Sequence, residues 1–280
     1  MGLWGRSPEK TRALAKSLGT TAYQTYDDLL VAVDAVAFAV PPDVQAQLAL
    51  VAAGAGKHLL LEKPVAADLD SARRLRDATA EAGVASLVFF TDRFVEESRA
   101  WFRQVAAGAG WRGGWLRWFS SLQQPNNPFG SSPWRQERGA LWDTGPHAVS
   151  TLIACLGPVL SVTAVAGAGD LVNLGFRHES GALSTATLTQ FAPPGAEGFE
   201  AAVWGERGVS YMPLRPDEAF VGAYSTAVDE LVATAGHESH ELDVAFGTRV
   251  VELIAVAQSQ LEAASLGSAD SAEAPAHLSN

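Results

Sequence analysis

The sequence predicts an α/β protein, with a parallel-sheet domain followed by an α+β domain that contains an open, mostly antiparallel sheet. Strand-like and helix-like patterns alternate over about the first ninety residues, which is typical of a parallel sheet. After Arg93 this alternation stops, and consecutive segments without helical periodicity are separated by glycine or proline. Two helical segments then follow. We therefore expect domains over 1–94 and 95–266 and a flexible tail over 267–280.

The first domain begins with a short strand end over 2–5 and a helix. Ser7 supplies an N-cap for this helix, a proline and an acid follow it, and Gly19 ends the helix. Leu14 and Leu18 predict its apolar face. Continuous apolar runs predict buried strands further along, and Asp68 predicts an N-cap for the later of two further helices. We expect these strands over 34–40, 58–61 and 84–90, and these helices over 43–53 and 68–82.

The second domain is predicted to contain more strands than helices. Its helices are expected over 96–107, 146–156, 218–235 and 242–264. Its strands are expected over 115–122, 159–166, 171–178, 182–191, 199–205 and 209–212. A polar loop broken by proline is expected over 123–139.

Composition excludes several classes of protein. Acidic residues outnumber basic ones by 31 to 20, for a net charge of −11, which disfavours binding to nucleic acid or to an anionic membrane. The single cysteine, Cys155, rules out an intramolecular disulfide, and we expect it to pack as a small hydrophobic residue. We expect no metal site. The sequence shows no signal peptide and no membrane span, so we expect a cytoplasmic protein.

The first domain resembles a dinucleotide-binding (Rossmann-like) domain without its opening unit. Such a domain starts with a strand, a Gly-x-Gly-x-x-Gly turn and a helix. The match over 108–113 has the wrong context, because it leaves a helix and enters a strand. The start of the chain resembles the end of the second strand instead, so about 30 residues are expected to be missing. Either the gene model starts late or the protein lacks this unit, and the sequence leaves both possibilities open.

Two motifs carry the chemistry. Glu62-Lys63-Pro64 follows a buried strand, at the edge of the sheet where ligands bind in such folds. A lysine there can stabilise negative charge on a substrate oxygen. Asp143 and His147 are four residues apart at a predicted helix start, where the helix dipole favours an anion and a neutral imidazole. Each motif also has an alternative when it is taken alone. Lys63 could be a surface lysine at the end of a strand, and Asp143 could be a helix cap beside a histidine that only fills space.

Together, these motifs and their order resemble the Gfo/Idh/MocA family, which includes glucose–fructose oxidoreductases and inositol dehydrogenases. The resemblance extends from Gly2 to about Ala264. It rests on Val40-Pro41-Pro42, Gly56-Lys57-His58, Glu62-Lys63-Pro64, Arg93-Phe94, the segment from Asp143 to His147 and the segment from His240 to Val250.

The resemblance implies an NAD(P)-dependent oxidoreductase that acts on CH–OH groups of a sugar, inositol or related polyhydroxylated substrate. It implies that Lys63 polarises the reacting oxygen, that His147 takes the proton in the oxidation direction, and that Asp143 holds the histidine or a substrate hydroxyl. The cofactor contacts expected are Arg6, Ser7, Pro41, Pro42, Glu62 and Lys63. The substrate contacts expected are Arg93, Trp134, Arg135, Asp143 and His147.

The chain departs from the family pattern at several points. Its glycine loop is absent, Ser150 stands where an aspartate often follows the histidine, and Gln45 replaces a frequent histidine. The polar loop around Asn126 and Asn127 is expected either to form a substrate wall or to be an ordinary exposed loop. Gly5-Arg6-Ser7 ends the predicted strand without an acid to bind a ribose 2′-hydroxyl, and Arg6 suits a 2′-phosphate, which favours NADP over NAD. The alternative is an arginine that extends into solvent.

Two functions follow from these observations. The first is the oxidoreductase. The second is a non-catalytic ligand-binding or assembly protein of the same fold that has lost dinucleotide binding. Trp115 and Trp118 point to opposite faces of their predicted strand, so we expect a partner subunit to cover one face in a dimer or larger homo-oligomer. A monomer in light scattering would contradict that expectation.

Overall fold

A computed structural model describes residues 1–123, 132–216, 218–237 and 239–272 of the chain. The chain forms two compact units. The first unit contains Met1–Phe89 and Tyr224–Thr248, and the second unit contains Phe90–Ala223 and the chain from Arg249 onward. The expected α/β class is confirmed, with parallel sheets in the first unit and a mixed, mostly antiparallel sheet in the second.

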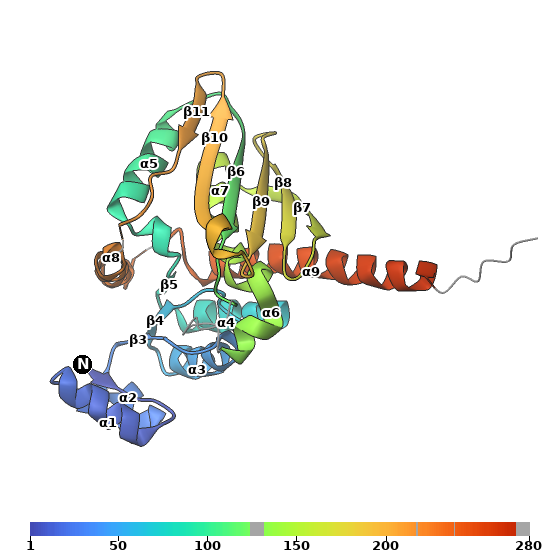
Figure 1. Cartoon of the computed structure of the whole chain (residues 1–280). Coiled ribbons are helices and arrows are strands. Elements are labelled where there is room, and N and C mark those ends of the chain that lie inside the picture. The colour runs from blue at the N-terminus through green and yellow to red at the C-terminus, as the bar shows by residue number, and fades with distance from the viewer. Residues whose placement is uncertain (124–131, 217, 238, 273–280) are drawn as a thin grey trace, which may run out of the picture. The chain divides into compact units, whose positions relative to one another are not determined.

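Short parallel strands form two sheets in the first unit (Figure 1). In one sheet, β1 (Gly2–Leu3) pairs with β2 (Thr21–Ala22). In the other, β4 (His58–Leu61) lies between β3 (Ala35–Ala37) and β5 (Ser86–Val88). The three leucines of β4 are buried, which explains the continuous apolar run of a strand that is covered on both faces.

Two helices of the first unit begin at caps that the sequence predicts. Ser7 caps α1 (Pro8–Ser17) and Asp68 caps α4 (Leu69–Ala82), each by accepting a hydrogen bond from a backbone amide of the first turn. A third predicted helix, α3, runs over Pro42–Gly54 and begins without a side-chain cap. Ser7 and Asp68 satisfy amide groups that have no partner within their helices, so these two predicted caps are confirmed.

The apolar face predicted for α1 is wrong. Leu14 and Leu18 are 52% and 59% exposed, and the helix buries Thr11 and Ala15 instead. The Thr11 hydroxyl donates a 2.8 Å hydrogen bond to the backbone carbonyl of Ser7, so the threonine is buried without leaving its hydroxyl unpaired. Small side chains allow α1 to approach the short strands β1 and β2 closely. Leucine spacing alone did not predict which face would be buried.

Two elements were missed between α1 and β3. The sequence analysis placed nothing over 20–33, where β2 and α2 (Tyr26–Ala32) form. A capping box starts α2, because Thr25 accepts from the amide of Asp28 and the Asp28 carboxylate accepts from the amide of Thr25. This Thr-x-x-Asp pattern was the available signal, but the helix has only seven residues and lacks a visible apolar period.

The later segment of the first unit includes the end of α8 (Ala219–Thr234) and the start of α9 (Val244–Ala272). Just before α9, the carbonyl of Leu242 accepts a 2.8 Å hydrogen bond from the amide of Val88 in β5. The amide of Val244 donates to Ser86 Oγ at 3.1 Å. The segment before α9 thus pairs the amide of Val88 and the hydroxyl of Ser86 on the side of β5 away from β4.

A six-stranded sheet forms the second unit within the described part of the chain (Figure 1). Its strand order is β11-β10-β6-β9-β8-β7, and the neighbours are antiparallel except for the parallel pair β6 and β9. The strands are β6 (Trp111–Phe119), β7 (Val159–Ala166), β8 (Val172–His178), β9 (Leu183–Thr189), β10 (Gly198–Gly205) and β11 (Gly208–Tyr211). All six lie close to the segments predicted, so this sheet is confirmed.

The helices of the second unit include α5 (Glu96–Ala107), α6 (Pro133–Asp143) and α7 (Gly145–Leu156). The Gly-x-Gly-x-x-Gly match over 108–113 leaves α5 and enters β6, as predicted, because its last three residues are the first three of β6. The loop predicted over 123–139 is wrong from Pro133 on, where α6 starts, and residues 124–131 lie outside the described chain. Proline and arginine gave α6 a polar pattern that does not resemble an amphipathic helix.

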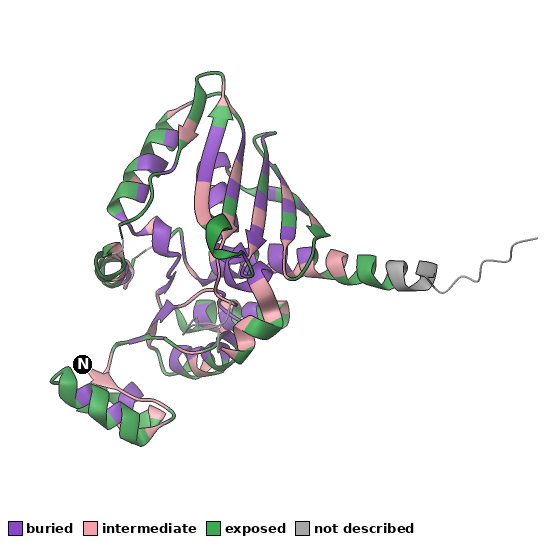
Figure 2. Ribbon diagram, in the orientation of Figure 1, coloured by how far each residue is buried: buried purple, intermediate pink, exposed green. Residues whose placement is uncertain are grey.

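One face of the six-stranded sheet is buried and the other is open. Burial alternates along β8 and β9 (Figure 2), as expected when only one face is covered. The helix α7 packs against β6 and β9. Along the edge strand β7, Gln260 of α9 accepts from the amide of Ala164 and donates to the carbonyl of Val162, both at 2.9 Å. The helix therefore satisfies an edge that could otherwise pair with another chain.

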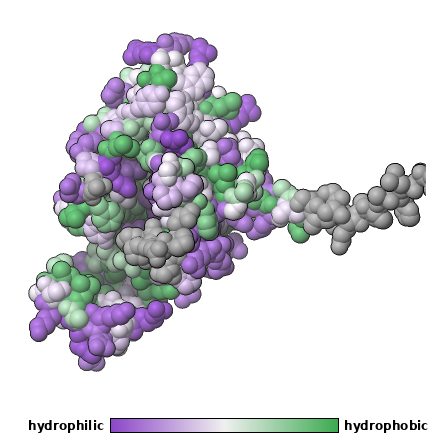
Figure 3. All heavy atoms as spheres, in the orientation of Figure 1, coloured by the Kyte–Doolittle hydropathy of each residue, from purple (hydrophilic) through white to green (hydrophobic). Residues whose placement is uncertain are grey.

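Among the residues that the structure describes, no helix is both long and apolar enough to cross a membrane. On the face shown in Figure 3, hydrophobic residues are scattered among hydrophilic ones.

The burial of His178 predicts that the stability of the protein depends on pH. It is buried at the end of β8, and its ring nitrogens lie 2.7 Å from the carbonyl of Gly157 and 2.8 Å from Ser184 Oγ. Burial lowers the pKa of His178 below its ordinary value of 6.5. The unfolded chain therefore binds the proton at a higher pH than the folded chain does. The resulting stability is present above pH 6.5 and is lost as the pH falls from there toward the lower pKa of the folded state.

Urea unfolding between about pH 7.5 and 5 tests this. In His178→Gln the free energy of unfolding should depend less steeply on pH than in the parent protein, whereas in the exposed control His237→Gln it should follow the parent. Equal slopes in the parent and in His178→Gln would contradict the assignment.

Candidate functional site

In the first unit, the predicted residues lie at the carboxyl ends of parallel strands. Pro41 and Pro42 follow β3, and Glu62-Lys63-Pro64 follows β4 directly. Because parallel strands end at the same edge of their sheet, both segments belong to the edge where ligands bind in such folds. The Lys63–Pro64 peptide bond is cis.

The turn that carries Lys63 is hydrogen-bonded to a buried side chain of α3. Gln45 Nε2 donates to the carbonyl of Glu62 at 2.8 Å, and its Oε1 accepts from the amide of the same residue at 2.8 Å. The same nitrogen lies 3.3 Å from the carbonyls of Pro64 and Val65. The turn is thus held on both sides of the lysine.

A second feature of the first unit is a cavity of about 330 Å³ at the end of β1. Arg6, Ser7 and Lys10 bring polar and basic groups to it, at the N-terminus of α1. A helix N-terminus with basic side chains favours an anionic group. The full lining is Leu3, Trp4, Gly5, Arg6, Ser7, Lys10, Thr11 and Leu14.

In the second unit, Asp143 is a buried carboxylate with defined donors. Arg135 Nε donates to its Oδ2 at 3.2 Å and Gln190 Nε2 donates to the same oxygen at 2.7 Å. Asp143 is the last residue of α6 and precedes α7, whose N-cap residue is Thr144. It therefore stands before the first turn of α7, as expected, but it does not cap that helix.

His147 lies in the first turn of α7 and is 9% exposed. Its ring contacts the ring of Trp118, with centroids 5.5 Å apart, and the ring of Phe90 at 6.3 Å and near-perpendicular orientation. The imidazole is thus packed against two aromatic rings at the amino end of α7.

A network behind Asp143 was not found by sequence reasoning. Asp170, in the connection from β7 to β8, accepts from the hydroxyl of Thr189 at 2.6 Å and from the amides of Gln190 and Ala140 at about 3.1 Å. It thereby joins the end of β9 to α6, next to Gly139, which has a φ of +61°. No local pattern marks Asp170 or Gln190, because their partners are distant in the sequence.

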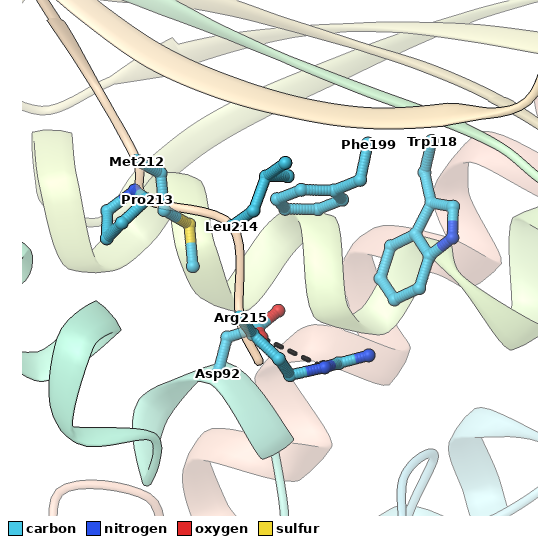
Figure 4. Close-up of a pocket in the computed structure, with 7 residues that line it drawn as sticks. All are labelled: Asp92, Trp118, Phe199, Met212, Pro213, Leu214 and Arg215. Carbon is cyan, nitrogen blue, oxygen red and sulfur yellow. Dashed lines mark hydrogen bonds and ion pairs between the residues drawn. The ribbon is translucent and has the colours of Figure 1, made fainter. Parts of the chain in front are cut away.

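The second unit also contains a pocket of about 200 Å³ (Figure 4). The rings of Trp118 and Phe199 line it at 84° to each other, with centroids 5.2 Å apart. The Asp92 carboxylate lies at another part of the lining and accepts from Arg215 Nη1 at 2.9 Å. Burial raises the pKa of Asp92, and the guanidinium of Arg215 opposes part of that rise. The remaining lining residues are Met212, Pro213 and Leu214.

Trp118 connects the pocket with the candidate base, because its ring both lines the pocket and contacts His147. The sequence indicates only the sheet face of Trp118, and no local pattern marks Asp92, Phe199 or Arg215 as site residues. Residues 92 and 215 lie far apart in the sequence, so only the fold brings them together.

Other predicted residues lie elsewhere in the second unit. The guanidinium of Arg93 lies over the ring of Phe102, 5.4 Å from its centroid. Trp134 is half-buried, and its Nε1 has no hydrogen-bond partner among the described residues. Neither residue lines the pocket of Figure 4. Ser150 is buried, and its hydroxyl has no hydrogen-bond partner among the residues that the structure describes. Asn126 and Asn127 fall outside the described residues.

Comparison with known proteins agrees with this architecture. Residues 1–90 match the oxidoreductase family with an NAD-binding Rossmann fold, and residues 95–210 match the GFO/IDH/MocA C-terminal domain. The fold and both matches define a class of oxidoreductases with an NAD-binding Rossmann fold. The chain belongs to the Gfo/Idh/MocA oxidoreductase family.

Curated relatives include a 1,5-anhydro-D-fructose reductase from Ensifer adhaerens, which is 31% identical over 65% of this chain and 60% of its own length. A levoglucosan dehydrogenase from Pseudarthrobacter phenanthrenivorans is 29% identical over 46% of this chain and 35% of its own length. The matched stretches thus span about a third to three-fifths of these relatives.

Solved structures share the fold over most of the chain. An oxidoreductase domain protein from Kribbella flavida has a TM-score of 0.79 at 23% identity, covering 93% of this chain and 88% of that one. A levoglucosan dehydrogenase in complex with NADH and levoglucosan has a TM-score of 0.78 at 17% identity, covering 92% and 86%.

Loss of the hydrogen bond from Gln190 to Asp143 should lower the stability of the folded protein. Gln190→Met removes a donor from a buried carboxylate, so the free energy of unfolding should fall by about 1–3 kcal/mol. Urea unfolding measures this change. The control is Gln104→Met, at an exposed position of α5, which should stay within about 0.5 kcal/mol of the parent protein. Equal effects of the two substitutions would rule out a special role for Gln190.

Proposed function

We propose that this chain is an NAD(P)-dependent oxidoreductase that transfers a hydride between the nicotinamide and a carbon of a sugar, inositol or related polyhydroxylated compound. In this proposal the first unit holds the dinucleotide and the second unit holds the substrate. One observation carries the proposal: Lys63 stands directly after a buried parallel strand, in a turn fixed by hydrogen bonds, in a chain of this family. The activities of the relatives support it.

The proposed cofactor site fits the residues of the first unit in two places. Arg6, Ser7 and Lys10 would hold the ribose and its phosphate in the cavity at the end of β1. Pro41 and Pro42 would lie along the dinucleotide, beside Glu62-Lys63 at the strand ends. When bound, the nicotinamide supplies the hydride donor or acceptor. The lysine ammonium stabilises negative charge on the substrate oxygen as its proton leaves.

The pocket of Figure 4 supports a polyhydroxylated substrate. The faces of Trp118 and Phe199 offer apolar surface to the C–H groups of a sugar ring. Asp92 and Arg215 offer an acceptor and donors to hydroxyl groups. In this proposal His147 takes the proton of the reacting hydroxyl during oxidation, and Asp143 holds the histidine or a neighbouring substrate hydroxyl. Arg93, Trp134 and Arg135 remain proposed substrate contacts.

One observation favours a second function, a ligand-binding or assembly protein without dinucleotide chemistry. The Gly-x-Gly-x-x-Gly match over 108–113 follows α5 and enters β6, so it does not begin a helix and cannot place amides at a pyrophosphate in the usual way. The pocket beside Trp118 would still bind a sugar-like compound on this alternative.

The basic residues at the end of β1 support NADP as the preferred cofactor. A 2′-phosphate adds negative charge, which Arg6 and Lys10 would pair at the N-terminus of α1. A homo-oligomer is also proposed, and the open face of the six-stranded sheet supports it. Apolar side chains exposed on its strands include Leu160, Val165, Leu183 and Trp204.

Lys63→Met should lower turnover by about 100-fold or more, because the charged donor for the reacting oxygen is lost. The assay follows NADPH or NADP⁺ absorbance with 1,5-anhydro-D-fructose, levoglucosan and a panel of sugars and inositols. Lys57→Met, which changes a lysine just before the amino end of β4, should retain the turnover of the parent protein. Turnover of Lys63→Met equal to that of the parent would refute the catalytic role of the lysine.

Arg6→Gln should weaken NADPH binding about tenfold and leave NADH binding unchanged, because only NADPH carries the phosphate that the arginine would pair. Calorimetric titration with each dinucleotide measures both affinities. Arg12→Gln, at an exposed position of α1, serves as the control and should bind both as the parent protein does. An equal loss of both affinities in Arg6→Gln would contradict a role in choosing NADP.

A further inference from the structure

Gln45 is completely buried in α3, with 0% of its surface exposed. A buried amide carries donors and an acceptor that all need partners. Its neighbours in the helix do not supply them. The partners come instead from residues 17 to 20 positions later in the sequence, in the turn that follows β4.

The bonds of Gln45 bracket Lys63. On one side, the amide group forms a two-way contact with the backbone of Glu62, which it both donates to and accepts from at 2.8 Å. On the other side, Nε2 reaches the carbonyls of Pro64 and Val65 at 3.3 Å. Lys63 is therefore the residue whose flanking backbone this side chain fixes.

The turn needs such a partner. Strand pairing fixes β4 only as far as Leu61, whose carbonyl accepts from Phe89. Pro64 and Val65 are buried beyond it, so their carbonyl groups are shielded from water, and an unpaired buried carbonyl costs about 1–3 kcal/mol. Gln45 Nε2 lies within hydrogen-bond reach of both.

We infer that Gln45 is a positioning residue for Lys63: its buried amide holds the Glu62–Val65 turn and thereby directs the lysine toward the reacting oxygen. This inference rests on the proposed function, in which Lys63 contacts the substrate. Because an amide is neutral throughout the physiological pH range, this positioning should not itself depend on pH.

The choice of side chain at this position has testable consequences. Gln45→Met keeps a similar length but removes both the donor and the acceptor. Gln45→Glu keeps the acceptors but removes the donor, and it places a carboxylate against three carbonyl oxygens. Gln45→His retains one donor and one acceptor, so it should restore much of what methionine loses. Gln47→Met, at an exposed position of the same helix, is the matched control.

Turnover of the best compound in the sugar panel tests the inference. Gln45→Met should lower kcat about 10- to 100-fold, because small displacements of a catalytic group carry large penalties, while the KM for NADPH changes less than about threefold. Gln45→Glu should lose at least as much, Gln45→His should recover most of the rate, and Gln47→Met should match the parent. In a Lys63→Met background, Gln45→Met should have no further effect, since it acts through the lysine.

Equal factors of loss in the two backgrounds would overturn the inference, because a general structural defect lowers turnover whether or not the lysine is present. Failure of Gln45→His to recover any rate, with Gln45→Met still folded by thermal unfolding, would count against it as well. If instead Lys63→Met alone keeps full turnover, the proposed catalytic role of the lysine fails. This outcome differs from the one in which Gln45→Met lowers turnover by the same factor in both backgrounds, which contradicts only the positioning role of Gln45.

Hydrogen exchange provides a readout that needs no substrate. The amide of Glu62 donates to Gln45 Oε1, so its exchange should become at least about tenfold faster in Gln45→Met, while the amide of Leu59, which donates to Ala85 in the sheet, should exchange as in the parent. Unchanged exchange at Glu62 would show that Gln45 does not hold the turn, and the inference would be wrong whatever the activity.

Discussion

Most buried polar groups of folded proteins are hydrogen-bonded, and two buried glutamine side chains form such bonds beside the candidate catalytic residues. Gln45 in the first unit and Gln190 in the second are both 0% exposed. Gln45 satisfies the backbone around Lys63, and Gln190 donates to the carboxylate of Asp143. A neutral amide suits both places, because it supplies a donor and an acceptor together without burying a charge.

The surrounding elements determine what each glutamine can reach. In the first unit, α3 begins at the carboxyl end of β3 and β4 ends at the same edge, so a side chain early in α3 meets the turn after β4. In the second unit, Gln190 follows β9 immediately, and Asp170 accepts from its backbone amide while its side chain turns to Asp143. The chemistry of each unit thus depends on where parallel or neighbouring strands end, which is a property of the family fold.

The sequence predicted the elements whose signals are local. The strand His58–Leu61, the helix Glu96–Ala107 and the strand Val159–Ala166 have the predicted bounds, because apolar runs and flanking glycine or proline mark them clearly. Elements with weak local signals were missed: α2 is short, and α6 has a polar pattern. The buried face of α1 also differed, since packing against short strands selected small residues over leucine.

For the candidate site, the sequence identified residues that belong to compact motifs, and it missed those that act across the fold. Lys63, Asp143 and His147 stand in recognisable patterns. The pair of Asp92 with Arg215 joins residues 123 positions apart, and Gln190 reaches Asp143 across 47. Gln45 was noted only as a substitution for histidine, because the hydrogen bonds that explain it depend on the position of a later strand.

The proposed function requires this chain to bind a nicotinamide dinucleotide, and calorimetric titration of the 280-residue protein with NADPH and NADH measures that binding. We expect saturable binding at one site per chain, with tighter binding of NADPH. A folded protein that releases or absorbs no heat with either dinucleotide, yet binds a sugar of the panel, would contradict the account and favour the non-catalytic binding protein.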